Sequence, residues 1–284
     1  MNNIKKKKKS ILFFISIILI TCCYNMDKNI SYNTFLDNDK IKDILTKSKL
    51  DVEIIDYIYT NFSYLTGKIY YLRNSADTEC MIMATKDDLY IIFCGTQFSF
   101  DDKLSLIKDI ITDLKIALVE IDESNPDVKI QYGYKDNIYC DNLFGQIYEI
   151  VLKHLDLNMF ICGHSMGCGL ALYCSILLEK KIKKKNFNLI TISPTKIGNV
   201  NLKKYIQSKK YINHINMINN YEIIPLYPFN NLDYHHITKN TWNFKKDGTL
   251  DKINSLDLSI FMNYSINDHF CNQIIKNIYK NIIL

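Results

Sequence analysis

The segment Gly163-His164-Ser165-Met166-Gly167 carries the clearest chemical signal in the sequence. A serine with a glycine two residues away on either side is typical of a nucleophile elbow, a tight strand-to-helix turn that displays the serine hydroxyl. The segments on either side are those that such a turn requires. Residues 159–162 are an apolar run typical of a buried strand, and residues 168–178 favour an apolar helix. The pattern predicts acyl transfer by Ser165. The alternative is an ordinary strand-to-helix turn with glycines for close packing.

A serine hydroxyl needs a base that takes its proton, and in this kind of turn the chain order is serine, then an acid, then histidine. His164 sits beside the nucleophile, where its ring cannot easily reach the Ser165 oxygen. The candidate bases are therefore the histidines after residue 165: His214, His235, His236 and His269. Residue types alone leave both the base and the acid open.

The sequence pattern alternates between strands and helices, and this alternation predicts the fold that would position these groups. We expect a hairpin from residues 80–85 and 89–94, and further strands at 159–162, 188–193 and 212–218. Helical spacing covers residues 40–65, 104–118, 141–155, 170–178, 201–209 and 268–279. The prediction is an α/β-hydrolase fold with a mostly parallel central sheet covered by helices. The chain shows neither an internal repeat nor a low-complexity linker after its leader, so one domain is expected.

The first 23 residues are expected to lie outside this fold. A basic run at residues 5–9 precedes an apolar run at 11–20 and small residues at 21–23, the pattern of a secretory signal peptide. The domain would then span residues 24–284. Ten apolar residues are short for a membrane span. The alternatives are an uncleaved signal anchor that holds the protein at a membrane, or a buried N-terminal helix.

Composition excludes several classes of protein. The net charge is +5, and the five lysines at residues 5–9 equal it, so the rest of the chain is near neutral and nucleic-acid binding is not expected. The nine cysteines include no CxxC pair and no zinc-like cysteine–histidine spacing, so neither a metal nor a cofactor is expected. Cys94 and Cys162 lie in apolar runs and are predicted to be buried free thiols.

The order of motifs over residues 80–275 resembles the fungal-type triacylglycerol lipases, the class 3 lipases. Eight short segments carry the resemblance, and they match strand ends, loops or turns of that family: residues 92–96, 109–114, 131–134, 163–171, 192–199, 219–228, 234–242 and 268–269. Single matches of this length are weak, whereas eight in the same order are specific.

The resemblance implies a role for each of five residues. Ser165 would be the nucleophile, His269 the general base, and Glu222 the acid that orients His269. The backbone N–H groups of Met166 and Thr96, with the Thr96 hydroxyl, would form the oxyanion hole.

Three positions depart from the family pattern: Cys94 replaces an arginine, Glu222 replaces an aspartate, and Gln131 replaces a histidine. Glu222 is one methylene longer than aspartate, so its reach differs. Asp233 is the substitute acid if Glu222 is only a surface acid beside a turn. His236 is expected to be structural, like its counterpart in the family.

The resulting hypothesis is a secreted serine lipase or carboxylesterase that hydrolyses acylglycerol esters through an acyl-enzyme. Its partner would be a lipid or another ester substrate, at a lipid interface or in solution, without a stable protein partner. Residues 97–108 would border the acyl site or act as a lid, or else form a core-packing helix. The alternatives are phospholipase A1 or another carboxylesterase, and a non-catalytic relative that binds lipid or protein.

Overall fold

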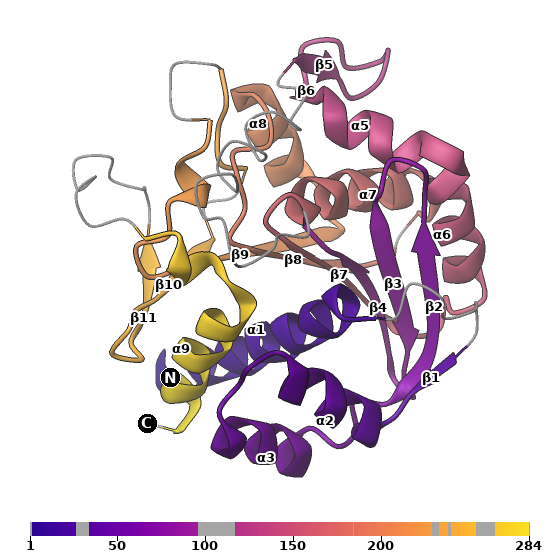
Figure 1. Cartoon of the computed structure of the whole chain (residues 1–284). Helices are drawn as coiled ribbons and strands as arrows, with labels where there is room; N and C mark the ends of the chain where they lie inside the picture. The colour runs from indigo at the N-terminus through magenta and orange to yellow at the C-terminus, as the bar shows by residue number, and fades with distance from the viewer. Residues whose placement is uncertain are drawn as a thin grey trace.

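A sheet of nine strands runs through the centre of the residues that the structure describes (Figure 1). The computed structural model describes residues 2–26, 34–95, 117–183, 185–228, 233–237, 240–253 and 265–283. In order across the sheet, the strands are β1 (Thr34–Leu36), β2 (Gly67–Arg73), β3 (Glu79–Ala84), β4 (Asp88–Phe93), β7 (Asn158–His164), β8 (Phe187–Ile192), β9 (Ile212–Asn219), β10 (Thr241–Phe244) and β11 (Leu250–Ile253).

Strands β4, β7, β8, β9 and β10 are parallel, and antiparallel strands flank them on both sides. The predicted hairpin is β3 and β4, and the other predicted strands are β7, β8 and β9, so these predictions are confirmed. Strands β4, β7 and β8 are rich in apolar residues because both faces of the sheet are covered there. This is the α/β-hydrolase arrangement that the sequence predicts.

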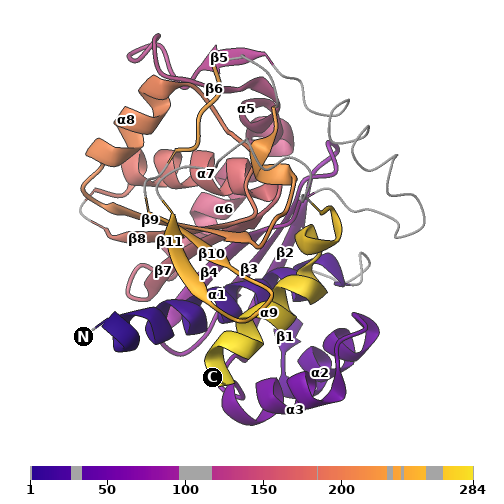
Figure 2. The ribbon, with the colours of Figure 1, turned by 90° about the vertical axis from the view of Figure 1, so that its left-hand side faces the viewer.

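Helices cover the sheet in two layers (Figures 1 and 2). One layer contains α5 (Tyr132–Tyr139), α6 (Leu143–Leu152), α7 (Gly167–Lys181) and α8 (Val200–Ser208), and the other contains α1 (Asn2–Tyr24), α2 (Asn38–Lys47), α3 (Val52–Asn61) and α9 (Cys271–Ile283). Alternate residues of β4 face the two layers, since Ile91 and Phe93 lie in one apolar cluster and Tyr90 and Ile92 in the other. A small ribbon of β5 (Leu118–Glu120) and β6 (Lys129–Gln131) lies apart from the sheet.

The helix predicted over residues 40–65 is two helices, α2 and α3. Lys49 adopts a left-handed backbone conformation with φ of 56°, which an α-helix cannot contain, and Asp51 then precedes the first residue of α3. Apolar spacing continues across this break, and therefore the sequence pattern reads as one helix. The predicted helix at residues 104–118 lies almost wholly outside the described residues.

Helix α1 is buried against the sheet and α9 (Figure 2). Phe13, Phe14 and Ile17 to Ile20 have no exposed surface. This is the arrangement expected from the alternative of a buried N-terminal helix, while removal of residues 1–23 stays a prediction. None of the helices in the described part of the chain has the length and apolarity of a membrane span.

A disulfide joins Cys23, near the end of α1, to Cys94, just after β4, with their Cα atoms 6.5 Å apart. The prediction of a free thiol at Cys94 was therefore wrong, because a local apolar pattern does not reveal which distant segment packs against a strand end. Cys162 is buried and free, as predicted.

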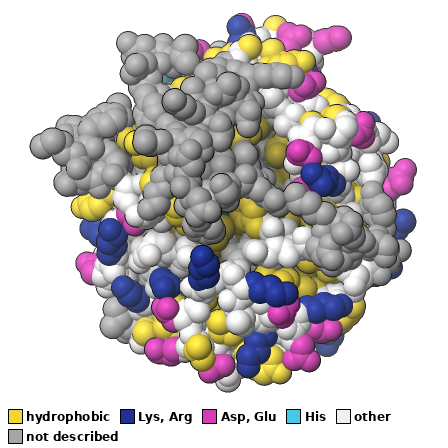
Figure 3. All heavy atoms as spheres, in the orientation of Figure 1, with side chains coloured by type: hydrophobic (Ala, Val, Ile, Leu, Met, Phe, Trp, Pro, Cys, Tyr) yellow, Lys and Arg dark blue, Asp and Glu magenta, His cyan; other side chains and the backbone are white. Residues whose placement is uncertain are grey.

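The surface in the view of Figure 3 is mixed in charge. Basic and acidic side chains are interspersed over the lower part of the face. The described surface there presents no single sign of charge, and this fits the near-neutral balance of the chain after residue 9.

Cys94→Ala should lower the free energy of unfolding by about 2–4 kcal/mol, because the disulfide closes a loop of 71 residues in the unfolded chain. Cys174→Ala is the matched control, since Cys174 is a buried free thiol. Urea unfolding with and without reductant measures both, and reductant should destabilise the control but not Cys94→Ala. Equal stability of the two variants would contradict the disulfide.

Candidate active site

The carboxyl ends of four neighbouring strands bring the candidate residues to one edge of the sheet. Phe93 of β4 pairs with Gly163 of β7, and His164 at the end of β7 pairs with Ile192 of β8. Each strand is followed by a turn at that edge, and in open α/β sheets this edge is where ligands bind. Ser165 and the segment that holds Glu222 are therefore neighbours although 57 positions separate them.

Ser165 occupies the predicted turn between strand β7 and helix α7. Its φ is 55°, in the left-handed region that non-glycine residues rarely adopt, and its N–H donates to the Ile192 carbonyl at 3.0 Å. A Cβ on Gly163 would lie 2.3 Å from the Gly167 carbonyl oxygen, and one on Gly167 would lie 2.4 Å from that of Phe93. Both glycines are required because the backbones approach too closely for a side chain.

Glu222 and His269 form a buried pair. Nδ1 of His269 lies 2.9 Å from Oε2 of Glu222, and the other carboxylate oxygen accepts the Asn219 N–H at 2.6 Å. Asn219 ends strand β9, and His269 ends the 3-10 turn Asn267–His269. The Ser265 N–H donates to the Tyr221 carbonyl at 2.8 Å, which holds the two segments side by side. Glu222 therefore reaches the imidazole of His269 from its own turn.

Burial sets the charge states of the pair. It lowers the pKa of His269 to about 3 and raises the pKa of the Glu222 carboxyl, because water does not reach either charged form. The Asn219 N–H favours the ionised carboxylate and opposes part of that rise. A cationic His269 is consequently stable here only beside an anionic Glu222, and without that partner the imidazole is neutral.

The two atoms that proton transfer from a serine requires, Oγ of Ser165 and Nε2 of His269, are among the buried polar atoms that have no hydrogen-bond partner in the described part of the chain. The rings of His164 and His269 stack with centroids 4.6 Å apart, so the base lies beside the residue that precedes Ser165. A hydroxyl that can donate and an imidazole nitrogen that can accept are thus both left available.

The structure describes one of the two candidate oxyanion-hole residues, Met166, and the residue that precedes the other, Gly95. A Cβ on Gly95 would lie 2.9 Å from the Ser165 Cβ, so the strand end that precedes Thr96 packs directly against the nucleophile. Thr96 itself lies outside the described residues, as do residues 97–108. Met166 immediately precedes helix α7, whose N-terminus favours negative charge.

The other candidates lie elsewhere. Asp233 is exposed and its carboxylate lies 3.4 Å from the ring of His235, so it does not take the place of Glu222. Nε2 of His236 donates to the carbonyl oxygen of Pro225 at 2.7 Å, in the segment that follows Glu222. Within the described ranges, no group of histidine, cysteine and acidic residues is arranged to hold a metal ion.

Sequence reasoning missed three contributors to this site: Asn219, the contacts of His164, and Tyr24. Asn219 was detectable, because it stands three residues before Glu222 in a run that resembles the family pattern. Tyr24 was not detectable, because its contact with His164 joins residues 140 positions apart through the packing of α1.

Comparison with known proteins agrees with the geometry. The profile of the family described as lipase (class 3) matches residues 91–232, which is half of the chain. No curated protein sequence matches the chain.

Solved structures of fungal lipases share the fold. The triacylglyceride lipase of Rhizomucor miehei is 15% identical with a TM-score of 0.65, and the match covers 95% of this chain and 97% of that one. Lipase II of Rhizopus niveus is 15% identical with a TM-score of 0.66, covering 92% and 93%. A structure from Penicillium cyclopium is 13% identical with a TM-score of 0.67, covering 94% and 97%.

These TM-scores establish a common fold, and the match to the family profile includes the elbow, the Gly95 strand end and the Glu222 segment. The chain therefore belongs to the class 3 lipase family and is a serine ester hydrolase.

Proposed function

We propose that this protein hydrolyses the ester bonds of acylglycerols through an acyl-enzyme on Ser165. The observation that carries the proposal is the buried Glu222–His269 pair, with neither Oγ of Ser165 nor Nε2 of His269 hydrogen-bonded to any described residue. Family membership supports it. One similar structure is described as a triacylglycerol lipase whose catalytic centre is a serine protease triad.

The chemistry follows from the atoms available. Nε2 of His269 takes the Ser165 proton as Oγ attacks the ester carbonyl carbon, and the Glu222 carboxylate stabilises the imidazolium that forms. His269 then gives the proton to the departing alcohol, which leaves an acyl ester on Ser165. Water attacks that ester by the same route and releases the fatty acid.

The N–H groups of Met166 and Thr96 stabilise the oxyanion in both steps. The Met166 N–H lies at the start of α7, where the helix dipole favours negative charge. The Thr96 N–H follows Gly95, whose backbone packs against Ser165.

We also infer that the protein enters the secretory pathway, directed by its N-terminal segment. Support comes from the basic and apolar runs at residues 5–9 and 11–20, and from the Cys23–Cys94 disulfide, a bond of oxidising compartments. Fractionation of the source cells tests this, and recovery of the protein only from the cytosol with both thiols reduced would contradict it.

The substrate prediction is tested with p-nitrophenyl esters of increasing chain length, triacylglycerol emulsions and phospholipid vesicles. We expect ester turnover and covalent labelling by a fluorophosphonate probe. Both should be lost in Ser165→Ala and kept in Ser175→Ala, since Ser175 is a buried serine that donates to the Leu172 carbonyl within α7.

The outcomes separate the candidate functions. Preference for vesicles over emulsions would instead assign a phospholipase A1, and turnover of short esters alone would assign a carboxylesterase. Absence of both turnover and labelling would leave a non-catalytic lipid-binding relative and contradict the proposal.

Glu222→Gln should lower kcat by about 10³–10⁴-fold, because a neutral amide cannot stabilise the His269 imidazolium. Asp233→Asn removes an exposed carboxylate and should leave kcat unchanged. Ester turnover measures both variants, with thermal unfolding to verify folding. A large loss in Asp233→Asn with normal activity in Glu222→Gln would reverse the assignment of the acid.

The pH dependence follows from the lowered pKa of His269. The neutral imidazole is the active form, so kcat/KM falls as pH drops through the pKa of the free enzyme. Because burial lowers that pKa below the ordinary 6.5, protonation of His269 should reduce activity only below pH 6.5. Burial also raises the pKa of Glu222, so an NMR titration of His269 in the free enzyme from pH 8 to 4 is needed to assign a midpoint to the ring. A His269 midpoint at or above 6.5 would show that burial does not control this histidine.

A further inference from the structure

We propose that Tyr24 is a positioning residue of this active site. Its hydroxyl contacts both Gly95, which precedes the oxyanion-hole residue Thr96, and the ring of His164. That ring in turn contacts the turn that carries the base His269. The inference rests on the proposed ester hydrolysis at Ser165 and adds a residue that the triad and oxyanion hole do not include.

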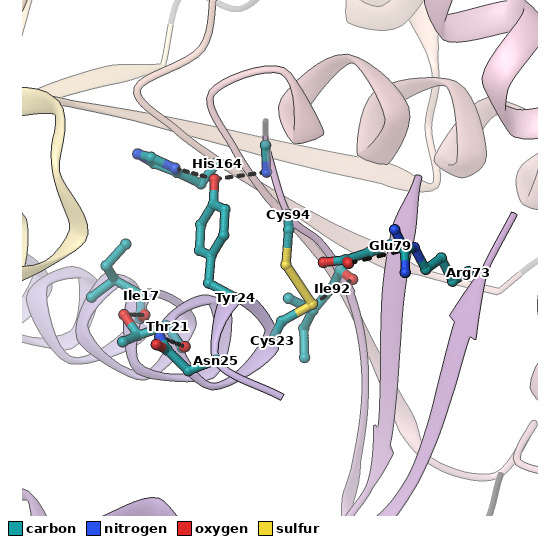
Figure 4. The surroundings of a disulfide bond; sticks show 11 residues. Ile17, Thr21, Cys23, Tyr24, Asn25, Arg73, Glu79, Ile92, Cys94 and His164 are labelled. Atoms are coloured by element: carbon teal, nitrogen blue, oxygen red, sulfur yellow. Dashed lines mark hydrogen bonds and ion pairs between the residues drawn. A yellow bond between two sulfur atoms is a disulfide. The ribbon is translucent and has the colours of Figure 1, made fainter. Parts of the chain in front are cut away.

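Three hydrogen bonds form one continuous chain, and Figure 4 shows the two that involve Tyr24. The Gly95 N–H donates to the Tyr24 hydroxyl oxygen at 2.7 Å, and that oxygen lies 3.0 Å from Nδ1 of His164. Nε2 on the other side of the ring lies 3.0 Å from the backbone carbonyl oxygen of His269. The chain thus runs from the end of β4, through the elbow, to the 3-10 turn of the base.

A single arrangement of protons satisfies all three contacts with a neutral His164. The His269 carbonyl can only accept, so Nε2 of His164 carries the proton and Nδ1 must accept. Tyr24 therefore donates its O–H to Nδ1 while its oxygen accepts from Gly95. Burial lowers the pKa of His164 well below its ordinary value, which keeps the ring neutral. The His269 carbonyl thereby fixes the tautomer of His164, and the tyrosine hydroxyl supplies the donor that the unprotonated Nδ1 requires.

These contacts act on two catalytic positions at once. The Gly95 backbone packs against Ser165 and leads directly into Thr96, so a shift of Gly95 moves an oxyanion donor. The His269 carbonyl belongs to the residue whose ring must meet Ser165, and the His164 ring also stacks on that ring. Because displacement of a reacting group by about 1 Å can cost about 100-fold in rate, a hydroxyl that restrains both is positioned to affect kcat.

Helix α1 places the tyrosine. Tyr24 is the last residue of α1, and the preceding Cys23 is bonded to Cys94, the residue before Gly95. Neighbouring residues of the two segments are thus joined by a disulfide and by a hydrogen bond. Cleavage after Cys23 would remove both the helix and the disulfide, so we infer that α1 stays attached in the active enzyme.

The first test compares Tyr24→Phe with Tyr173→Phe. The control removes another hydroxyl from a buried tyrosine, which donates to the Ile121 carbonyl from helix α7. Tyr24→Phe should lower kcat on a p-nitrophenyl ester about 10–100-fold with KM within about twofold, whereas Tyr173→Phe should keep both constants. Thermal unfolding of both variants separates misfolding from mispositioning.

Adding Tyr24→Phe to His164→Phe should cost no further activity, because both substitutions break the same chain. Additive losses, or a kcat of Tyr24→Phe within twofold of the wild type, would overturn the proposal. Wild-type turnover that is lost in Ser165→Ala establishes the hydrolase separately, so failure of Tyr24 as a positioning residue remains distinguishable from failure of the proposed function.

A readout that needs no turnover is the ¹⁵N shift of Nδ1 of His164 in labelled protein. It should be that of a hydrogen-bonded acceptor nitrogen in the wild type and in Tyr173→Phe, and should move to that of an acceptor without a donor in Tyr24→Phe. An unchanged Nδ1 shift in Tyr24→Phe would contradict the proposed role of the hydroxyl.

Retention of α1 is tested by peptide mass mapping of the reduced protein from its own cells. Trypsin cuts after lysine, so a retained helix yields the peptide of residues 10–28. Recovery of that peptide from fluorophosphonate-labelled enzyme is expected. A labelled enzyme that begins at Tyr24 would overturn the role of the helix.

Discussion

The hydrogen bond between His269 and Glu222 is the interaction on which the site depends. The two side chains are almost fully buried and 2.9 Å apart, so neither can carry its charge alone. This mutual dependence is useful for catalysis, because the imidazolium needed during ester cleavage is stable only while the carboxylate is ionised beside it. The rest of the structure can be understood as the means of holding this pair against Ser165.

Buried amide groups of two asparagines hold the segments that carry Glu222 and His269. The Asn219 side chain donates to the Asp268 carbonyl at 2.6 Å and accepts from Asn277 of α9 at 2.9 Å, while its backbone N–H holds Glu222. One asparagine therefore fixes the acid, the turn of the base and the C-terminal helix together. Since each of these polar groups is buried and satisfied, the network favours a single geometry.

Much of the fold could be predicted from the sequence because its signals are local. The apolar runs of β7 and β8 and the glycines around Ser165 each depend on a few neighbouring residues. Glu222 and His269 came from resemblance to a family, since 47 residues separate them and no local pattern pairs them. The Cys23–Cys94 bond and the Tyr24–His164 contact depend on how α1 packs, and the leader-like pattern of residues 1–23 favours a different interpretation.

The central claim is that Ser165 becomes acylated during turnover. Ser193 is the other serine that could act as the nucleophile, because it is also buried, follows strand β8 and has a φ of 55°. The most direct measurement is acid quenching of the enzyme during turnover of a p-nitrophenyl ester, followed by peptide mass mapping of the trapped acyl group. We expect one acyl group, on Ser165. An acyl group on Ser193, or steady turnover without any acylated serine, would contradict it.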